Sequence, residues 1–511
     1  MASITLNIEL NRVEGDLEFQ VDLEDNRVVD ARCIGTLFRG FEQLLVGRAP
    51  KDALVITPRV CGICGSAHLY SAALALERMN QLPVPPQATI IRNLCLMAEN
   101  LQSDIRQTFL FFMPDFMNPR YQAHPLRVDV EEAFAPLKGR VVLSALAASR
   151  RLVVIVAIFG GQWPHSTYMV PGGVTRGAHA RDLVDCLDIL DEVQRWYEQD
   201  VLGDSLDNWL ALDSSEALFR WLEDPRHADS AIGMFTRFAR DHELHTYGAG
   251  AAHYLSAGAH YDPHRWSAPY DEQHTLLRSG LYDATNHRLE NFDPAHISEH
   301  VRHSWYRPYE GGRHPFEGET VPDYQPESDR YSWSKAPRYD DRVVETGPLA
   351  ELLTGGDALL TDLLQREGAN TWLRQFGRVR RAGVLLDLMR AQVQALATEL
   401  SAPHYLPPPA EALQDGDGFG LVQAARGTLG HWVQVRNGRI ARYQIVTPTA
   451  WNASPKDSEG RPGHWEQSVI GLTLKDPDNP VEIDHVVRSH DPCLVCTVHF
   501  VDSGRKRRYG A

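Results

Sequence analysis

The sequence predicts a mainly α-helical fold, with small antiparallel β-sheets near the N- and C-terminal ends of the chain. Apolar residues alternate near the N-terminus, recur at helical spacing through long central segments, and alternate again around residue 437. Alternation with a period of two is typical of half-buried strands, whereas a spacing of three and four residues is typical of helices that bury one face.

The first predicted elements are two strands at the N-terminus. Apolar residues alternate over residues 4–10 and again over residues 17–21, and Glu24-Asp25-Asn26 favours a turn. We therefore expect a small antiparallel sheet at this end.

The central segments have helical periodicity. Pro85-Pro86 precede a stretch whose apolar residues predict a long helix to about Phe112, and similar spacing predicts helices over residues 183–197 and 384–400. The apolar run 141–161 contains Arg150 and Arg151, which would be costly inside a bilayer. We expect a core helix there, with no transmembrane segment.

Steady periodicity is lost between residues 240 and 345. This region holds half of the 22 histidines, but their irregular spacing favours ordinary surface and interface residues over a metal cluster. Strand patterning returns at residues 431–435 and 439–443, which flank the hairpin signal Asn437-Gly438. Because no linker or repeat interrupts the chain, we expect one interlocked domain.

Composition excludes several classes of protein. The 511 residues carry a formal net charge of -16, which argues against a nucleic-acid surface. Seven scattered cysteines are too few for a disulfide framework, and their odd number favours a reducing compartment. Met1 to Leu10 lacks a basic region followed by an apolar core, so we expect no secretion signal. The expected location is cytoplasmic, with membrane association only through partners.

Two Cys-x-x-Cys pairs lie at opposite ends of the chain, Cys61 with Cys64 and Cys493 with Cys496. Four converging thiolates would form a soft site suited to zinc, iron-sulfur clusters, copper(I) or nickel. Zinc ribbons hold their pairs within about 15 to 20 residues of each other, whereas more than 400 residues separate these two. A local zinc knuckle is therefore disfavoured, and a redox dithiol remains an alternative for either pair taken alone.

The surroundings of the two pairs resemble the large subunit of the nickel-iron hydrogenases. Residues 59–68 read Arg-x-Cys-Gly-x-Cys-x-x-x-His and residues 491–499 read Asp-Pro-Cys-x-x-Cys-x-x-His. Further similar blocks, which extend the resemblance over nearly the whole chain, lie at residues 171–174, 299–306, 335–339 and 345–350.

The resemblance implies the large-subunit fold and a binuclear centre. Nickel would be held by all four thiolates, with Cys61 and Cys493 as terminal ligands. Cys64 and Cys496 would also bridge to an iron that carries carbon monoxide and cyanide.

Proton transfer would depend on two residues under the same resemblance. Cys493 would accept the proton when dihydrogen is split, and Glu14 in Arg12-Val13-Glu14-Gly15 would carry it outwards. Asp16 stands where many members have a histidine, a departure that resembles the cyanobacterial-type uptake subgroup.

Polar residues around the centre are implied in the same way. Arg426 would overhang the open metal position, Thr449 would hydrogen-bond a cyanide, and His68 would hydrogen-bond a cysteine sulfur. Ser103 stands where many members have an aspartate beside that arginine, and we do not assign this role to its neighbour Asp104.

A third metal, magnesium by resemblance, is expected deeper in the protein. Its ligands would be Glu42, the carbonyl of Ile445 and the side chain of His499, because hard oxygen ligands suit that ion and a histidine leaves iron open.

The implied function is that of the catalytic large subunit of a nickel-iron uptake hydrogenase, which oxidises dihydrogen heterolytically. Electrons would pass to an iron-sulfur small subunit, because Cys33, Cys95 and Cys186 form no cluster motif. The alternatives are a regulatory hydrogen-sensing subunit with the same site, a metal-free structural homologue from a respiratory complex, and a structural zinc protein.

The last twelve residues, Phe500 to Ala511, include four basic side chains. A charged tail is usually a solvated end. The resemblance implies instead that nickel-insertion factors load the chain and a maturation endopeptidase then cuts after His499. We therefore expect a single domain over residues 1–499 and a C-terminal extension over residues 500–511 that maturation removes.

Overall fold

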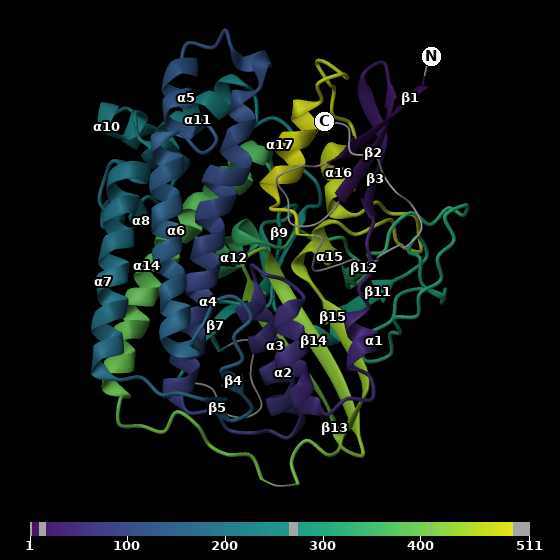
Figure 1. Cartoon of the computed structure of the whole chain (residues 1–511). Helices are drawn as coiled ribbons and strands as arrows, with labels where there is room; N and C mark the ends of the chain where they lie inside the picture. The colour runs from purple at the N-terminus through teal and green to yellow at the C-terminus, as the bar shows by residue number, and fades with distance from the viewer. Residues whose placement is uncertain (1–2, 10–16, 265–273, 410, 494–511) are drawn as a thin grey trace.

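Long helices form one side of the molecule and small antiparallel sheets the other (Figure 1). The computed structural model describes residues 3–9, 17–264, 274–409 and 411–493. The prediction of a mainly helical fold with sheets near both ends is confirmed.

The N-terminal sheet has three strands in sequential order, β1 (Ser3–Glu9), β2 (Leu17–Glu24) and β3 (Arg27–Gly35). Asp25 and Asn26 join the last two strands with φ angles of 48° and 63°, the left-handed pair that a tight hairpin turn needs. The two predicted strands are confirmed, and β3 extends the sheet beyond the prediction. Its buried face packs against Trp465 of α16 (His464–Val469).

The helical side is built on α4 (Pro86–Arg106), α6 (Arg140–Gly160), α7 (Ala180–Trp196) and α14 (Thr371–Thr398). A π-helical segment, Gln107–Phe112, continues α4, which confirms the predicted end at Phe112. The predicted start of the last helix at Val384 was wrong, because α14 begins at Thr371. Its first half buries arginines as well as apolar residues, so no apolar stripe marks it in the sequence.

Among the described residues, one helix, α6, is long and apolar enough to span a membrane. One such helix is weak evidence for a membrane span, since core helices of soluble proteins have the same length and composition. In this structure α6 packs against α4 and α7, and Arg151 on it pairs with Glu192 of α7 at 2.7 Å. The expected core position holds for its inner face, while Leu143 and Val154 are exposed on the outer face.

The C-terminal sheet consists of β13 (Gly416–Ala424), β14 (Gly427–Arg436) and β15 (Arg439–Val446). The predicted hairpin is confirmed, with Asn437 and Gly438 at φ angles of 52° and 68°. Helix α3 (Gly65–Met79) lies directly on β13. A Cβ on Gly420 would lie 2.1 Å from the carbonyl oxygen of Ser71, so glycine is required for this approach.

The histidine-rich region forms short strands that the sequence did not predict. They have only three or four residues each, too few for a visible alternation. They are β6 (His253–Ser256), β7 (Ala259–Tyr261), β8 (Thr275–Leu277), β9 (Gly280–Asp283), β10 (Arg288–Glu290), β11 (Ile297–His300) and β12 (Ala336–Tyr339).

The remaining helices and strands are short connecting elements. They are α1 (Phe41–Leu45), α2 (Ala53–Ile56), α5 (Arg127–Phe134), α8 (Leu206–Leu210), α9 (Ser215–Trp221), α10 (Pro225–Ala228), α11 (Ala231–Asp241), α12 (Pro348–Gly355), α13 (Ala358–Glu367), α15 (Pro448–Asn452), α17 (Val481–Ser489), β4 (Met169–Val170) and β5 (Gly173–Val174).

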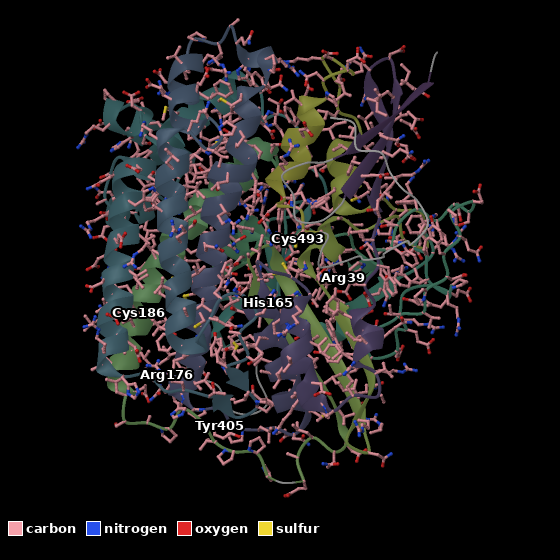
Figure 2. The ribbon with its side chains drawn as sticks, in the orientation of Figure 1. Arg39, His165, Arg176, Cys186, Tyr405 and Cys493 are labelled. Carbon is pink, nitrogen blue, oxygen red and sulfur yellow. The ribbon has the colours of Figure 1, made fainter. Side chains whose placement is uncertain are left out.

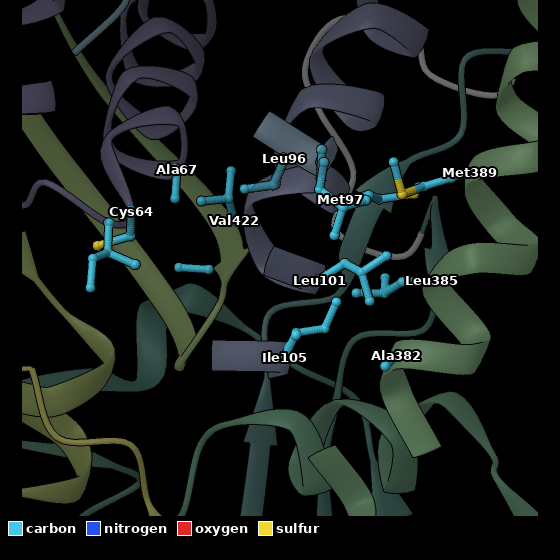
Figure 3. Close-up of a cluster of buried hydrophobic side chains, with 14 of the residues drawn as sticks. Cys64, Ala67, Leu96, Met97, Leu101, Ile105, Ala382, Leu385, Met389 and Val422 are labelled. Carbon is cyan, nitrogen blue, oxygen red and sulfur yellow. The ribbon is translucent and has the colours of Figure 1, made fainter. Parts of the chain in front are cut away.

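The main hydrophobic core joins the two sides of the molecule. Figure 3 shows Cys64 and Ala67 beside Val422 of β13, followed by side chains of α4 and then of α14. Cys61, Cys64 and Cys493 all belong to this core. The cysteines at the two ends of the sequence therefore meet inside the protein.

The buried side chain of His260 should make the stability of the protein depend on pH. Its ring is buried, neither nitrogen has a hydrogen-bond partner among the described residues, and burial lowers its pKa to about 3. The unfolded chain binds this proton below pH 6.5 and the folded chain does not, so stability falls as the pH drops towards 3. Between pH 7 and pH 4, the free energy of unfolding should therefore fall by about 3 kcal/mol more in the wild type than in His260→Phe.

Urea unfolding of the metal-free chain at both pH values measures this difference. His264→Phe, at an exposed histidine, is the matched control and should show a much smaller change. Parallel pH profiles for His260→Phe and wild type would contradict the prediction.

Candidate metal centre

Three of the four predicted ligand cysteines converge in the structure. Cys61 follows a 3-10 turn (Thr57–Arg59), Cys64 caps the N-terminus of α3, and Cys493 lies just after α17. The sulfurs of Cys61 and Cys493 are 3.7 Å apart, although 432 positions separate them in the chain. Figure 2 shows Cys493 near the middle of the molecule. Cys496 lies outside the described residues.

The thiol cluster is closed to water and supplied with backbone donors. Cys61 and Cys493 are fully buried, and Cys64 is 5% exposed. The backbone N–H groups of Ile63 and Cys64 each lie 3.4 Å from the sulfur of Cys61. Buried sulfur donors at this spacing fit a soft cation such as nickel, which would offset the charge of the thiolates.

Arg426 is a buried cation beside the thiols, and not a surface residue. It occupies the two-residue turn between β13 and β14, and its Nε lies 3.0 Å from Oδ1 of Asp491. Burial lowers its pKa, but Asp491 and the nearby cysteines raise that pKa well above the usual value. One terminal nitrogen, Nη1, is buried without a hydrogen-bond partner among the described residues. It is a permanent donor available to a ligand at the centre.

Asp491 continues into a buried network of charges. Its second oxygen lies 3.4 Å from Arg378, and Arg378 lies 3.1 Å from Asp104. Asp104 also accepts two hydrogen bonds from Arg381, at 2.7 and 2.8 Å. Asp491, and not Asp104, is thus the partner of Arg426, in agreement with the role withheld from Asp104. The Asp-Pro-Cys motif was the available signal for Asp491, which the sequence analysis did not single out.

His68 lies one helical turn after Cys64, on the first turns of α3. Its Nδ1 is 3.0 Å from Nε2 of His431, and its Nε2 has no hydrogen-bond partner among the described residues. Burial lowers the pKa of His68 to about 4, and the nearby Cys61 opposes this shift. The ring is therefore a neutral group beside Cys61, and no sulfur of the described residues is a hydrogen-bond partner of its Nε2.

Glu99 of α4 is a candidate that the sequence analysis missed. Its carboxylate accepts hydrogen bonds from the backbone N–H groups of Ser66 and Ala67, at 3.0 and 3.1 Å, just after Cys64. Burial raises the pKa of Glu99 to about 7, against these two N–H groups. The residues around Glu99 in the sequence give no sign of this role, because only tertiary packing brings the N-terminus of α3 next to α4.

Two residues of the predicted magnesium-type site, Glu42 and Ile445, are in contact, through the backbone N–H of Ile445 and not through the carbonyl that was predicted as a ligand. Glu42 of α1 accepts a hydrogen bond from the backbone N–H of Ile445 at 2.8 Å and another from the hydroxyl of Thr320. Lys335 lies nearby, 3.3 Å from Glu299 and 2.5 Å from Gln444. Glu42, Ile445, Lys335 and Glu299 line one pocket, together with Arg39 and Phe41. His499 lies outside the described residues.

The remaining predicted site residues are Thr449, which the structure describes, and Glu14, which it does not. Thr449 is buried in the first turn of α15, whose residues pack against β14. Glu14 lies outside the described residues, as do residues Phe500 to Ala511.

A second cluster, Glu345, His464 and His490, brings three possible ligand atoms within 4.8 Å of one another. The backbone N–H of Ala251 donates to Nδ1 of His464 at 2.9 Å, so a neutral ring carries its proton on Nε2. That nitrogen lies 3.1 Å from Glu345, whose two oxygens are each 3.0 Å from Nε of Arg374. A protonated nitrogen and a bound guanidinium make this a poor cation site.

A set of buried cysteine sulfurs beside a fixed arginine defines the class of protein. It is a metalloenzyme subunit whose metal centre lies inside the hydrophobic core. The family model described as nickel-dependent hydrogenase matches residues 39–124 and 229–499, and the chain belongs to this family.

Known relatives match over almost the whole chain. The large subunit of the periplasmic [NiFeSe] hydrogenase of Desulfomicrobium baculatum is 31% identical, over 96% of this chain and 94% of that protein. The uptake hydrogenase large subunit of Rhodobacter capsulatus is 28% identical, over 97% and 94%. The structure of the Ni-Fe-Se hydrogenase from D. vulgaris Hildenborough superposes with a TM-score of 0.82, at 27% identity, over 98% of this chain and 100% of that one.

These findings confirm the family suggested by the two cysteine motifs and its large-subunit fold. The chain is a hydrogenase large subunit, and family membership supports nickel and iron at its active site, a small-subunit partner and dihydrogen as substrate.

Proposed function

We propose that this chain is the catalytic large subunit of a nickel-iron uptake hydrogenase that oxidises dihydrogen heterolytically and passes electrons to an iron-sulfur small subunit. The contact between the Cys61 and Cys493 sulfurs beside Arg426 carries this proposal. The cyanobacterial-type uptake subgroup is the proposed affiliation, on the Asp16 departure. The relative from Rhodobacter capsulatus, named an uptake hydrogenase, supports the direction of the reaction.

The proposed centre is held by Cys61, Cys64, Cys493 and Cys496. Nickel, with an iron that carries carbon monoxide and cyanide, would supply the Lewis acidity that polarises dihydrogen. Cys493 takes the proton at its sulfur, and the closed core around it excludes water. Arg426 holds a fixed positive charge against the cluster, and Thr449 is the proposed donor to a cyanide.

Further parts of the proposal concern residues and partners around this centre. Magnesium would be held at Glu42, Ile445 and His499. A maturation endopeptidase and nickel-insertion factors would act on the chain before assembly with the small subunit. For location, we propose the cytoplasm, on the odd cysteine count, although the relative from Desulfomicrobium baculatum is named periplasmic.

Elemental analysis combined with infrared spectroscopy tests the function. The purified complex should contain nickel and iron and show absorption bands of bound carbon monoxide and cyanide. Zinc alone would favour the structural zinc protein, and absence of metal would favour the respiratory-complex homologue. A hydrogen-sensing subunit would show the same bands with slow turnover, so the rate of dihydrogen oxidation separates it from an uptake enzyme.

Glu14→Gln should retain the metals but slow hydrogen-deuterium exchange, because the amide keeps nearly the shape of the acid and cannot carry the proton. Metal content and the exchange rate, measured on the same preparation, separate the two effects. Asp16→Asn, two residues away, is the matched control and should exchange at nearly the wild-type rate. A normal exchange rate in Glu14→Gln would place the proton exit elsewhere.

The active form should end at His499. A retained tail would keep the end of the chain from closing over the centre and so hold the site open for metal loading. Intact-mass measurement of the hydrogen-oxidising complex should give a large subunit of residues 1–499, with residues 500–511 found only in the inactive precursor. Active protein that carries Phe500 to Ala511 would contradict this proposal and favour an unprocessed class.

A further inference from the structure

A buried line of hydrogen bonds leads away from His68. Nδ1 of His68 lies 3.0 Å from Nε2 of His431, and Nδ1 of His431 lies 2.8 Å from the hydroxyl of Tyr443. His68 and His431 are fully buried, and Tyr443 is 2% exposed. The thiol end of this line is Nε2 of His68, which has no hydrogen-bond partner among the described residues.

The fold holds the three side chains on one interface. His68 is on α3, which packs against β14. His431 of β14 is paired with Ile445 of β15, and Tyr443 precedes Ile445 by two positions. Tyr443 is thus the diagonal neighbour of His431 on the same face of the sheet. This register makes the contact independent of any flexible loop.

Two arrangements of protons are consistent along this line, because each neutral imidazole carries one proton. Burial lowers the pKa of His431 well below its usual value, so its ring is neutral. In the first arrangement Tyr443 donates to His431, His431 donates to His68, and His68 keeps its N–H at Nε2. In the second, every donor is reversed, and Nε2 of His68 carries a lone pair.

The hydroxyl of Tyr443 decides between these arrangements. Its hydrogen-bond partner, within the part of the chain that the structure describes, is His431 alone. If His431 were the donor, the hydroxyl hydrogen would be buried without an acceptor, which is costly. The first arrangement satisfies this hydrogen, and it leaves the N–H of His68 on Nε2, the nitrogen that has no partner among the described residues.

We propose that Tyr443 and His431 are positioning residues, which fix His68 in the tautomer that donates from Nε2 to a cysteine sulfur of the metal centre. The proposal rests on the proposed nickel-iron function for its consequence, and on this chain's own hydrogen bonds for the tautomer. A donor to sulfur withdraws electron density from the thiolate and so from the metal that it binds. Tyr443 would then tune the centre from three side chains away.

Neutron diffraction from deuterated crystals of the complete hydrogenase complex tests the tautomer directly. Deuterium is expected on Nε2 of His68, on Nε2 of His431 and on the hydroxyl of Tyr443, directed at His431. Deuterium on Nδ1 of His68 would overturn the proposal. This measurement needs no variant, so it decides the point even if Tyr443→Phe does not fold.

Tyr443→Phe tests the consequence. It removes the donor that sets the direction, so part of the His68 population should lose its N–H at Nε2. The carbon monoxide and cyanide bands of the variant should shift to lower wavenumber, because the thiolate becomes more electron-rich. Tyr197→Phe is the matched control, since it removes a buried hydroxyl that donates to the carbonyl of Val379 at 2.7 Å, and its bands should not move.

The outcomes separate the two proposals. Unshifted bands in Tyr443→Phe would overturn the positioning role. Wild-type protein without such bands would overturn the proposed function, and the neutron result would still decide the tautomer of His68.

Discussion

Replacement of Cys64 by alanine should abolish the metal centre and hydrogen oxidation together. Cys64 is the proposed bridging ligand, and it lies in a water-excluded core with Cys61 and Cys493. The other described cysteines outside the cluster could not replace its sulfur, because Cys33, Cys95 and Cys186 lie elsewhere, on β3, α4 and α7. Under the proposed assignment, loss of this thiolate would remove a ligand from nickel and from iron.

The measurement is the nickel and iron content per chain after purification, with the hydrogen-oxidation rate of the same sample. Cys186→Ala is the matched control, because it deletes a buried thiol on α7, among the long helices, whereas Cys493 lies near the middle of the molecule (Figure 2). It should lose some stability but keep both metals. Normal nickel and iron in Cys64→Ala would show that the ligand assignment is wrong.

The sequence predicted the parts of the fold that have long, regular patterns. The helices α4 and α7 and the β14–β15 hairpin appear where apolar spacing and Asn437-Gly438 place them. The first half of α14 was missed because its buried face includes Arg374, Arg378 and Arg381, whose charges are matched by carboxylates of other elements. Periodicity detects apolar burial, and a buried ion pair is invisible to it.

The same distinction applies to the candidate site: features that are local in sequence could be predicted, and contacts set by tertiary packing could not. The cysteine motifs predicted the ligands, since their spacing and flanking residues are local in sequence. Glu99, Asp491 and His431 act through partners more than thirty positions away, at Ser66, Arg426 and His68 respectively. Such pairs depend on how α3 lies on β13 and β14, so a single sequence carries little signal for them.

Arg426→Lys is the second change with a large expected effect. The guanidinium uses Nε for Asp491 while Nη1 remains available towards the centre, a division that its planar shape makes possible. A lysine ammonium in the same turn would keep the charge but reach one of these positions only. Turnover per nickel should fall by about 10²–10³, the cost typical of losing one fixed donor at a site of charge development.

Metal content should not change, since Arg426 is not a ligand, and this separates the effect from that of Cys64→Ala. Arg338→Lys is the matched control, because Arg338 is a buried arginine paired with Asp457 at 2.9 Å, and its other hydrogen-bond partners are Pro337, Ser454, Pro455 and Arg461. It should lower stability and leave turnover per nickel nearly unchanged. If Arg426→Lys turned over at the wild-type rate, the positive charge alone would be sufficient, and the shape of the guanidinium would have no part in the reaction.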